Sequence, residues 1–354
     1  MTIGYIKEEI LKNQFWRGIE IRIFDNNYVI AVSDKKKDKI RVKERLIKII
    51  KKLKIDALVF SKSLQGDFEN SVFDLLNSNN AYEKHKSSNS KTTSKPIKTG
   101  VVSIINGKKL MEFMEYDIVK YILDKQNADT KKEDIYIVFK RDSNLNLNFL
   151  KIFLEKFRLV NIVTNDVDKL KNIQDNLLDN EGILISVSNN KRKALKRAKY
   201  ILNINLTKEE LEKYRINREA VIINIKESVK YDEPCFDGVN INYFEISCPD
   251  EYFERFEAIE KTGSASGAIS IDKCNSNNNN NTNNNNGNQF DLAQMYESIL
   301  LQDRMDKTKL EAVYKRIKED NIKIVGLIGN NGPISDQELQ KIHIQNLDKM
   351  RKLV

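Results

Sequence analysis

The stretch from Ile135 to Ile246, where short apolar runs alternate with helical patterns, constrains the fold of this chain most strongly. The apolar runs are rich in Ile and Val, and amphipathic segments separate most of them. Strands and helices that alternate in this way form βαβ units, because a right-handed crossover brings each new strand alongside an earlier one in parallel. The pattern therefore predicts an α/β protein whose sheet is mostly parallel, doubly wound and covered by helices on both faces.

The expected strands and helices follow one another at short intervals. The strands are expected at 135–139, 160–164, 183–187, 201–204, 220–223 and 241–246, and the helices between them at 147–157, 167–178, 191–199 and 208–214. In this rhythm the stretch resembles the Rossmann-like domains of dehydrogenases, over about a third of the chain. The resemblance implies a Rossmann-like sheet with its ligand site at the carboxyl ends of the strands.

The flanking sequence predicts further units and two linkers. Period-two alternation at Ile19–Ile23 and Tyr28–Val32, across an Asp-Asn-Asn turn, is typical of a β-hairpin. Two tracts, Ser87–Pro96 and Asn277–Asn286, hold no apolar residue to bury and are expected to be disordered. The expected divisions are a small α/β unit at 1–77, a disordered linker at 78–99, a Rossmann-like domain at 100–260, a disordered Asn-rich insertion at 261–289 and a helical C-terminal region with one strand at 290–354.

Composition limits the class of protein. The 354 residues suffice for two compact domains, and a content of 40% hydrophobic and 31% charged residues is that of a globular chain. No run approaches the roughly 18 apolar residues of a membrane span, and the N-terminus lacks the apolar core of a secretory signal. We therefore expect a cytoplasmic protein with no membrane partner. The net charge of +9 is weak evidence for a polyanionic partner, because Lys, Asn and Ile are frequent throughout, including in the linkers.

Cysteine and histidine usage argues against metal and acid–base chemistry. The three cysteines, Cys235, Cys248 and Cys274, form no C-x-x-C pair, and the histidines are His85 and His343. Neither a disulfide framework nor a zinc site is expected, and His-based catalysis has little support. We therefore predict no metal and no cofactor, and favour a non-enzymatic protein.

Two positions at the carboxyl ends of the expected strands bear on dinucleotide binding. The loop Lys140–Asn144 follows the first strand, where a dinucleotide-binding domain carries G-x-G-x-x-G, and it contains no glycine. Asp166 ends the second strand, where such domains keep a ribose-binding acid. Asp is also a preferred N-cap residue, and we favour that interpretation for Asp166.

The third loop is the main candidate for an anion site. It leads into the basic segment 191–199, and a helix N-terminus favours an anion because its N–H groups are free and its dipole is positive. The candidate residues are Ser188, Asn189, Asn190, Lys191 and Arg192. We favour the interpretation that this segment is a solvated basic face. The two other interpretations are a site for a phosphate-bearing ligand, and a surface that binds nucleic acid or protein.

Three functions remain open from the sequence. The first is ligand sensing or protein interaction without catalysis on a Rossmann-like scaffold. The second is an enzyme that acts on a nucleotide or a phosphorylated metabolite. The third is nucleic-acid binding through the basic helix. The glycine turn Gly329–Pro333 is expected to be a structural turn, since it lacks the Lys-Ser/Thr ending of a phosphate loop.

Overall fold

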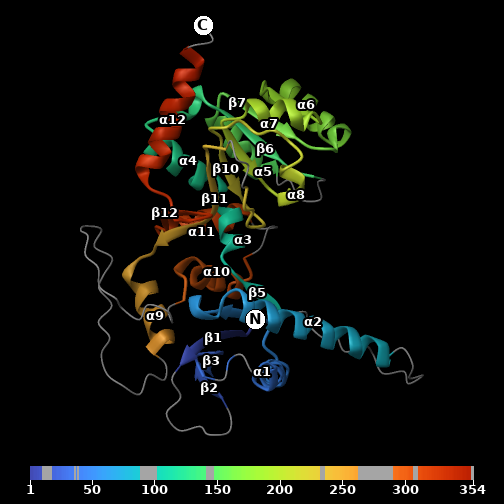
Figure 1. Cartoon of the computed structure of the whole chain (residues 1–354), viewed down its shortest axis with the longest axis vertical. Helices are drawn as coiled ribbons and strands as arrows, with labels where there is room; N and C mark the ends of the chain where they lie inside the picture. The colour runs from blue at the N-terminus through green and yellow to red at the C-terminus, as the bar shows by residue number, and fades with distance from the viewer. Residues whose placement is uncertain are drawn as a thin grey trace. The chain divides into compact units, whose positions relative to one another are not determined.

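The computed structural model describes residues 1–9, 18–35, 37, 40–87, 102–140, 147–231, 236–261, 290–305 and 310–351. The chain forms two compact units (Figure 1). Unit 1 comprises Met1–Gly107 and Pro249–Arg304, and unit 2 comprises Lys108–Cys248 and Met305–Val354. Each unit is therefore built from two separate segments, whereas composition led us to expect continuous ranges.

Unit 2 holds the predicted parallel sheet. Its parallel strands lie in the order β11-β10-β9-β6-β7-β8, and each is parallel to its neighbours. They are β6 (Asp134–Val138), β7 (Leu159–Val163), β8 (Ile185–Ser188), β9 (Tyr200–Asn203), β10 (Val221–Asn224) and β11 (Val239–Ser247). All six predicted strands are confirmed. The strand order reverses between β6 and β9, which makes this pair the topological switch point of a Rossmann-like sheet.

Two antiparallel strands extend the sheet beyond β11. They are β12 (Lys323–Gly329) and β13 (Gly332–Pro333), joined by the glycine turn that the sequence predicts to be structural. Gly332 has a φ of 113°, a backbone conformation that residues with a side chain rarely adopt. Helix α12 (Asp336–Arg351) follows and begins with a capping box, in which the Ser335 and Glu338 side chains each accept from the backbone N–H of the other.

Helices cover both faces of this sheet, as predicted. On one face, α7 (Lys191–Arg197) and α8 (Lys208–Leu211) bury Leu195 and Leu211 against Val138, Ile201 and Ile222. The other helices of unit 2 are α3 (Lys108–Phe113), α4 (Glu115–Lys125), α5 (Leu147–Lys156), α6 (Val167–Glu181) and α11 (Leu310–Glu319). Helix α12 packs against β11 and α4, and α5 packs against β7 and α11. No helix within the described residues is long and apolar enough to cross a bilayer.

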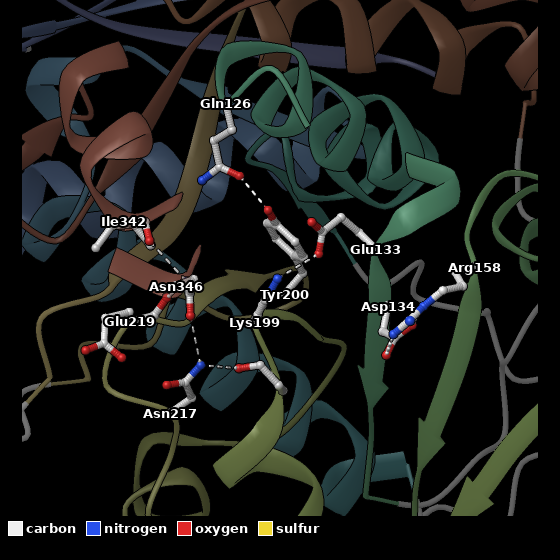
Figure 2. Close-up of polar contacts among 11 residues, drawn as sticks. Gln126, Glu133, Asp134, Arg158, Lys199, Tyr200, Asn217, Glu219, Ile342 and Asn346 are labelled. Atoms are coloured by element: carbon white, nitrogen blue, oxygen red, sulfur yellow. Dashed lines mark hydrogen bonds and ion pairs between the residues drawn. The ribbon is translucent and has the colours of Figure 1, made fainter. Parts of the chain in front are cut away.

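Side chains at the amino ends of the parallel strands fasten α4 and α12 to the sheet (Figure 2). Tyr200 at the start of β9 donates from its hydroxyl to Gln126 Oε1 at 2.6 Å, and Lys199 lies 3.2 Å from Glu133. Asn346 of α12 donates to a backbone carbonyl just before β10 at 2.8 Å. Burial raises the pKa of the Tyr200 hydroxyl, so it stays a donor at neutral pH. These contacts hold α4 and α12 at the amino end of the sheet.

Unit 1 contains a second sheet, in the order β2-β3-β1-β4-β5. Its strands are β1 (Ile3–Glu9), β2 (Ile19–Phe24), β3 (Asn27–Ser33), β4 (Ala57–Phe60) and β5 (Ser103–Ile105), and its helices are α1 (Ile40–Lys52), α2 (Asp67–Ser87), α9 (Asp250–Lys261) and α10 (Leu292–Gln302). The predicted hairpin is confirmed as antiparallel β2–β3. The sequence analysis missed the central strand β1, which is parallel to both β3 and β4, and the helix α9.

Residues 78–87 of the expected linker belong to helix α2. Helix α2 continues to Ser87, because residues 81–86 include Ala, Glu and Lys, which have high helix propensity. Residues 88–101 and the asparagine tract at 277–286 lie outside the described residues, so the expectation of disorder there stays a prediction.

Candidate anion-binding site

Polar residues gather where β6, β7 and β9 end, next to the topological switch point. Lys140 follows β6, Asn165 follows β7 and Asn205 follows β9. The backbone N–H of Lys140 donates to Asn205 Oδ1 at 2.9 Å, which joins the loops after β6 and β9. Two side chains from the helices on this face complete the group, Lys191 of α7 and Glu210 of α8. We call these five residues the switch-point cluster.

The loop before α7 caps its own helix. The side chain of Asn190 accepts from the Lys193 N–H at 3.0 Å, as an N-cap Asn does. The Asn190 N–H donates to Ser188 Oγ at 3.0 Å, and the Lys191 N–H donates to the Asn189 carbonyl at 2.9 Å. Protein groups therefore already occupy several backbone donors of this seven-residue helix. An anion here must bind mainly through side chains, and the helix N-terminus by itself does not form the site.

Lys191 is the most unusual member of the cluster, because it is a charged residue of which almost the whole side chain is covered, with its ammonium part-buried. The residue is 5% exposed, and its ammonium group donates to Asn165 Oδ1. Within the described part of the chain, no carboxylate lies within ion-pair distance of it. Burial lowers the pKa of the Lys191 ammonium, and the charge of Glu210 partly opposes that shift. A buried cation with only an amide partner is costly, and it creates a positive potential that an anion would relieve.

Lys140 and Glu210 form the second charged pair of the cluster. Lys140 Nζ lies 2.6 Å from Glu210 Oε1, and this ion pair holds the pKa of Glu210 below its ordinary value. The other oxygen, Glu210 Oε2, accepts from the Thr207 N–H at 3.2 Å as part of the capping box of α8. Two contacts therefore fix the Glu210 carboxylate, whereas the Lys140 side chain is 56% exposed and can reach a ligand.

The remaining candidates lie elsewhere. Arg192 and the other cations in the middle of α7 are exposed to solvent; they are Lys193, Lys196 and Arg197. Ser188, Asn189 and Asn190 shape the turn before α7. Sequence reasoning missed Asn165, Asn205 and Glu210, although the two asparagines could have been found as the first polar residues after predicted strands.

Asp166 lies at the N-cap position of α6, but its side chain makes no cap hydrogen bond. The expectation that it caps this helix with its carboxylate is therefore wrong. Its backbone N–H donates to Thr164 Oγ1 at 3.3 Å, and its carboxylate lies 3.7 Å from Lys169, one turn into the helix. Its φ of −98° and ψ of 53° lie outside the extended region that an N-cap residue usually adopts. A ribose-binding role for Asp166 stays a prediction.

Buried asparagines on neighbouring strands connect the carboxyl ends of β9 and β10 with the first half of β11. Asn224 Oδ1 accepts from Asn203 Nδ2 at 2.8 Å, and Asn224 Nδ2 donates to Asn242 Oδ1 at 3.0 Å and to Asn240 Oδ1 at 2.6 Å. Asn242 Nδ2 in turn donates to Asn330 Oδ1, in the β12–β13 turn, at 2.7 Å. We call this network the asparagine ladder. It satisfies amide groups that would otherwise be buried without partners, and it makes this end of the sheet rigid.

A second buried lysine lies beside the asparagine ladder. Lys108, the first residue of α3, donates from Nζ to the backbone carbonyls of Asn242 at 2.5 Å and Asn224 at 3.3 Å. Burial lowers the pKa of its ammonium to about 8. Two lysines with lowered pKa values thus lie near this end of the sheet, on different helices.

Metal ligation has no cluster to support it in the described residues. No group of three or more His, Cys, Asp or Glu side chains there could hold a metal ion. His343 lies on α12, where burial lowers its pKa, and Cys248 is partly exposed after β11. Cys235 and Cys274 lie outside the described residues, as does the side chain of His85.

Comparisons with known proteins add little to this description. No protein-family model matches the chain, and no curated protein matches it. Among solved structures, it is similar to the crystal structure of a putative aspartate carbamoyltransferase from Trypanosoma cruzi. The likeness has 11% sequence identity and a TM-score of 0.21, and covers 63% of this chain and 69% of the other. A likeness of this size carries no argument about function. The α/β fold described above follows from the strand order of the chain itself.

Proposed function

We propose that this protein binds a phosphate-bearing small molecule at the switch-point cluster and acts as a ligand-sensing protein. The observation that carries the proposal is the buried Lys191 ammonium, whose only partner in the described residues is the Asn165 amide oxygen. Its position supports the proposal, because ligands of open α/β sheets bind outside the carboxyl ends of the strands at the switch point. A bound anion would supply the countercharge that Lys191 lacks.

The other polar groups of the cluster suit a phosphate in particular. Asn165 and Asn205 each use Oδ1 as an acceptor, which leaves both Nδ2 groups to donate to phosphate oxygens. The exposed ammonium of Lys140 adds a flexible donor. The oxygens of a fully ionised phosphate accept hydrogen bonds and have none to donate. A set of ammonium and amide donors therefore complements them.

An enzyme acting on a nucleotide or phosphorylated metabolite is the alternative at the same cluster. The two functions share the binding step and differ in whether the bound molecule is changed. The non-enzymatic proposal is supported by the network that fixes this end of the sheet, in which the asparagine ladder and the Lys140–Glu210 pair use most of the polar groups for structure. It predicts binding without turnover.

The test is a ligand screen on the whole chain and two variants. Nucleotides, dinucleotides and sugar phosphates at millimolar concentration should raise the melting temperature of the wild type by mass action. Lys191→Met keeps the length of the side chain and removes its charge, and should weaken binding by at least about tenfold. Lys196→Met removes an exposed charge from the same helix and should leave binding unchanged.

Three results would overturn the proposal, two for the binding function and one for the non-enzymatic function. The binding function fails if no phosphate-bearing ligand shifts the melting temperature, or if Lys191→Met and Lys196→Met have equal effects. The non-enzymatic function fails if phosphorus NMR shows that the wild type consumes a bound ligand and that Lys191→Met does not.

A further inference from the structure

We infer that Glu210 sets the charge of the ligand, so that the switch-point cluster takes a singly charged phosphodiester in preference to a doubly charged phosphate monoester. The inference rests on the proposed function and names the chemical class of ligand for that site. It follows from the charges of the described residues and from the hydrogen bonds that hold Glu210 in place.

The cluster has one cation in excess. Lys140 and Glu210 neutralise one another at 2.6 Å, which leaves the buried charge of Lys191. A phosphodiester carries one negative charge and brings the site to neutrality. A monoester carries close to two at pH 8, because its second pKa is about 6. Its surplus charge would meet the Glu210 carboxylate in partly buried surroundings, where repulsion between like charges is strong.

Glu210 is held so that a ligand cannot easily displace it. Oε1 pairs with Lys140 and Oε2 accepts from the Thr207 N–H, so both oxygens are engaged. The capping box ties the carboxylate to the start of α8, and the buried side chain of Leu211 anchors that helix in the core. An incoming dianion would have to break the ion pair and the cap together. A monoanion can bind Lys191 with both intact.

The other described charges near the cluster do not change its excess of one positive charge. Lys213 acts on Glu210 but is exposed, so solvent screens it. Asp166 lies close to Lys169. Among the described residues, Glu210 is the one charge that opposes the pKa shift of the Lys191 ammonium. The preference for a single negative charge therefore depends on Glu210.

The experiment compares two ligands that differ by one methyl ester. Phenyl phosphate is doubly charged at pH 8, and methyl phenyl phosphate is singly charged. Titrations of the wild type, followed by NMR, should give the diester the lower Kd. Glu210→Gln removes the negative charge while Gln keeps the capping box, and it should tighten phenyl phosphate about tenfold and reverse the preference. Glu209→Gln makes the same change in net charge at an exposed neighbour and should keep the wild-type preference.

The outcomes separate the inference from the proposed function. If neither ligand binds the wild type, the proposed function fails with it. If the wild type binds the monoester more tightly, the inference fails and the binding function stands. Equal effects of Glu210→Gln and Glu209→Gln would also refute it, since bulk charge would then explain the change. The wild-type preference is measured without any variant, so it decides the question even if Glu210→Gln fails to fold.

Discussion

Replacing Lys108 with Met should remove a specific pH dependence from the stability of unit 2. The Lys108 ammonium is buried at the start of α3, with the carbonyls of Asn224 and Asn242 as hydrogen-bond acceptors. Burial lowers its pKa to about 8 from an ordinary value of 10.5. The folded state therefore holds this proton less firmly than the unfolded chain does.

The sign and size of the effect follow from proton linkage. Between the two pKa values the unfolded chain binds more protons, so the free energy of unfolding rises with pH. From pH 7 to pH 9.5 the expected rise is about 2 kcal/mol, from a total of roughly 3 kcal/mol for the full shift. Lys108→Met also loses two hydrogen bonds to carbonyls, but that loss does not depend on pH. The variant should therefore lack about 2 kcal/mol of the wild-type rise between pH 7 and pH 9.5, whatever its stability at pH 7.

Urea denaturation at intervals between pH 7 and pH 9.5, followed by circular dichroism, measures this slope. The tyrosines, whose raised pKa values act in the opposite direction, begin to titrate only near the top of this range, and they do so equally in the wild type and the variants. Lys109→Met, at the exposed next residue, is the matched control and should retain the wild-type slope. If Lys108→Met keeps the same rise as the wild type, the buried lysine is not its source, and the argument from burial is wrong.

Two further predictions concern the same sheet. Asn224→Leu keeps the size of the side chain but removes a hydrogen-bond partner from the amide groups of Asn203, Asn240 and Asn242. It should therefore lower the free energy of unfolding, measured by urea denaturation, by about 3 kcal/mol. A loss below about 1 kcal/mol would show that the asparagine ladder contributes little to stability. A variant with Gln at all four exposed cations of α7 should bind phosphate-bearing ligands within about twofold of the wild type. Nucleic-acid binding that falls steeply with salt and disappears in this variant would instead support that alternative. The four residues substituted in the α7 variant are Arg192, Lys193, Lys196 and Arg197.

The parallel sheet could be predicted because its strands are buried on both faces. Ile135–Val138 and Val221–Ile223 are continuous apolar runs, and a run of this kind has no competing amphipathic interpretation when helical patterns flank it. Strand β1 was missed although Ile3, Tyr5 and Ile6 are buried, because its second half, Lys7–Glu9, is charged and breaks the apolar pattern. Its place between β3 and β4 depends on pairing with residues far along the chain, which local patterns do not encode.

The candidate site could be predicted only in part. A basic segment after β8 was visible in the sequence, but nothing there distinguishes Lys191 from the exposed cations beside it. The distinction arises from packing, which buries Lys191 against Asn165. The sequence did not indicate a role for Glu210 for the same reason. Its contact with Lys140 joins two loops that are adjacent only because the strand order places β9 beside β6.

The two-segment construction of each unit has a consequence for how the chain can fold as it is synthesised. Helix α10 packs against β4 and β5 of unit 1, yet it is made only after the whole parallel sheet of unit 2. Strand β12 and helix α12, which complete unit 2, come last of all. Neither unit can be finished while the ribosome is still translating the middle of the sequence. Both units must therefore wait, partly formed, for their second segments, and a chain truncated near residue 305 would leave β11 as an unpaired sheet edge.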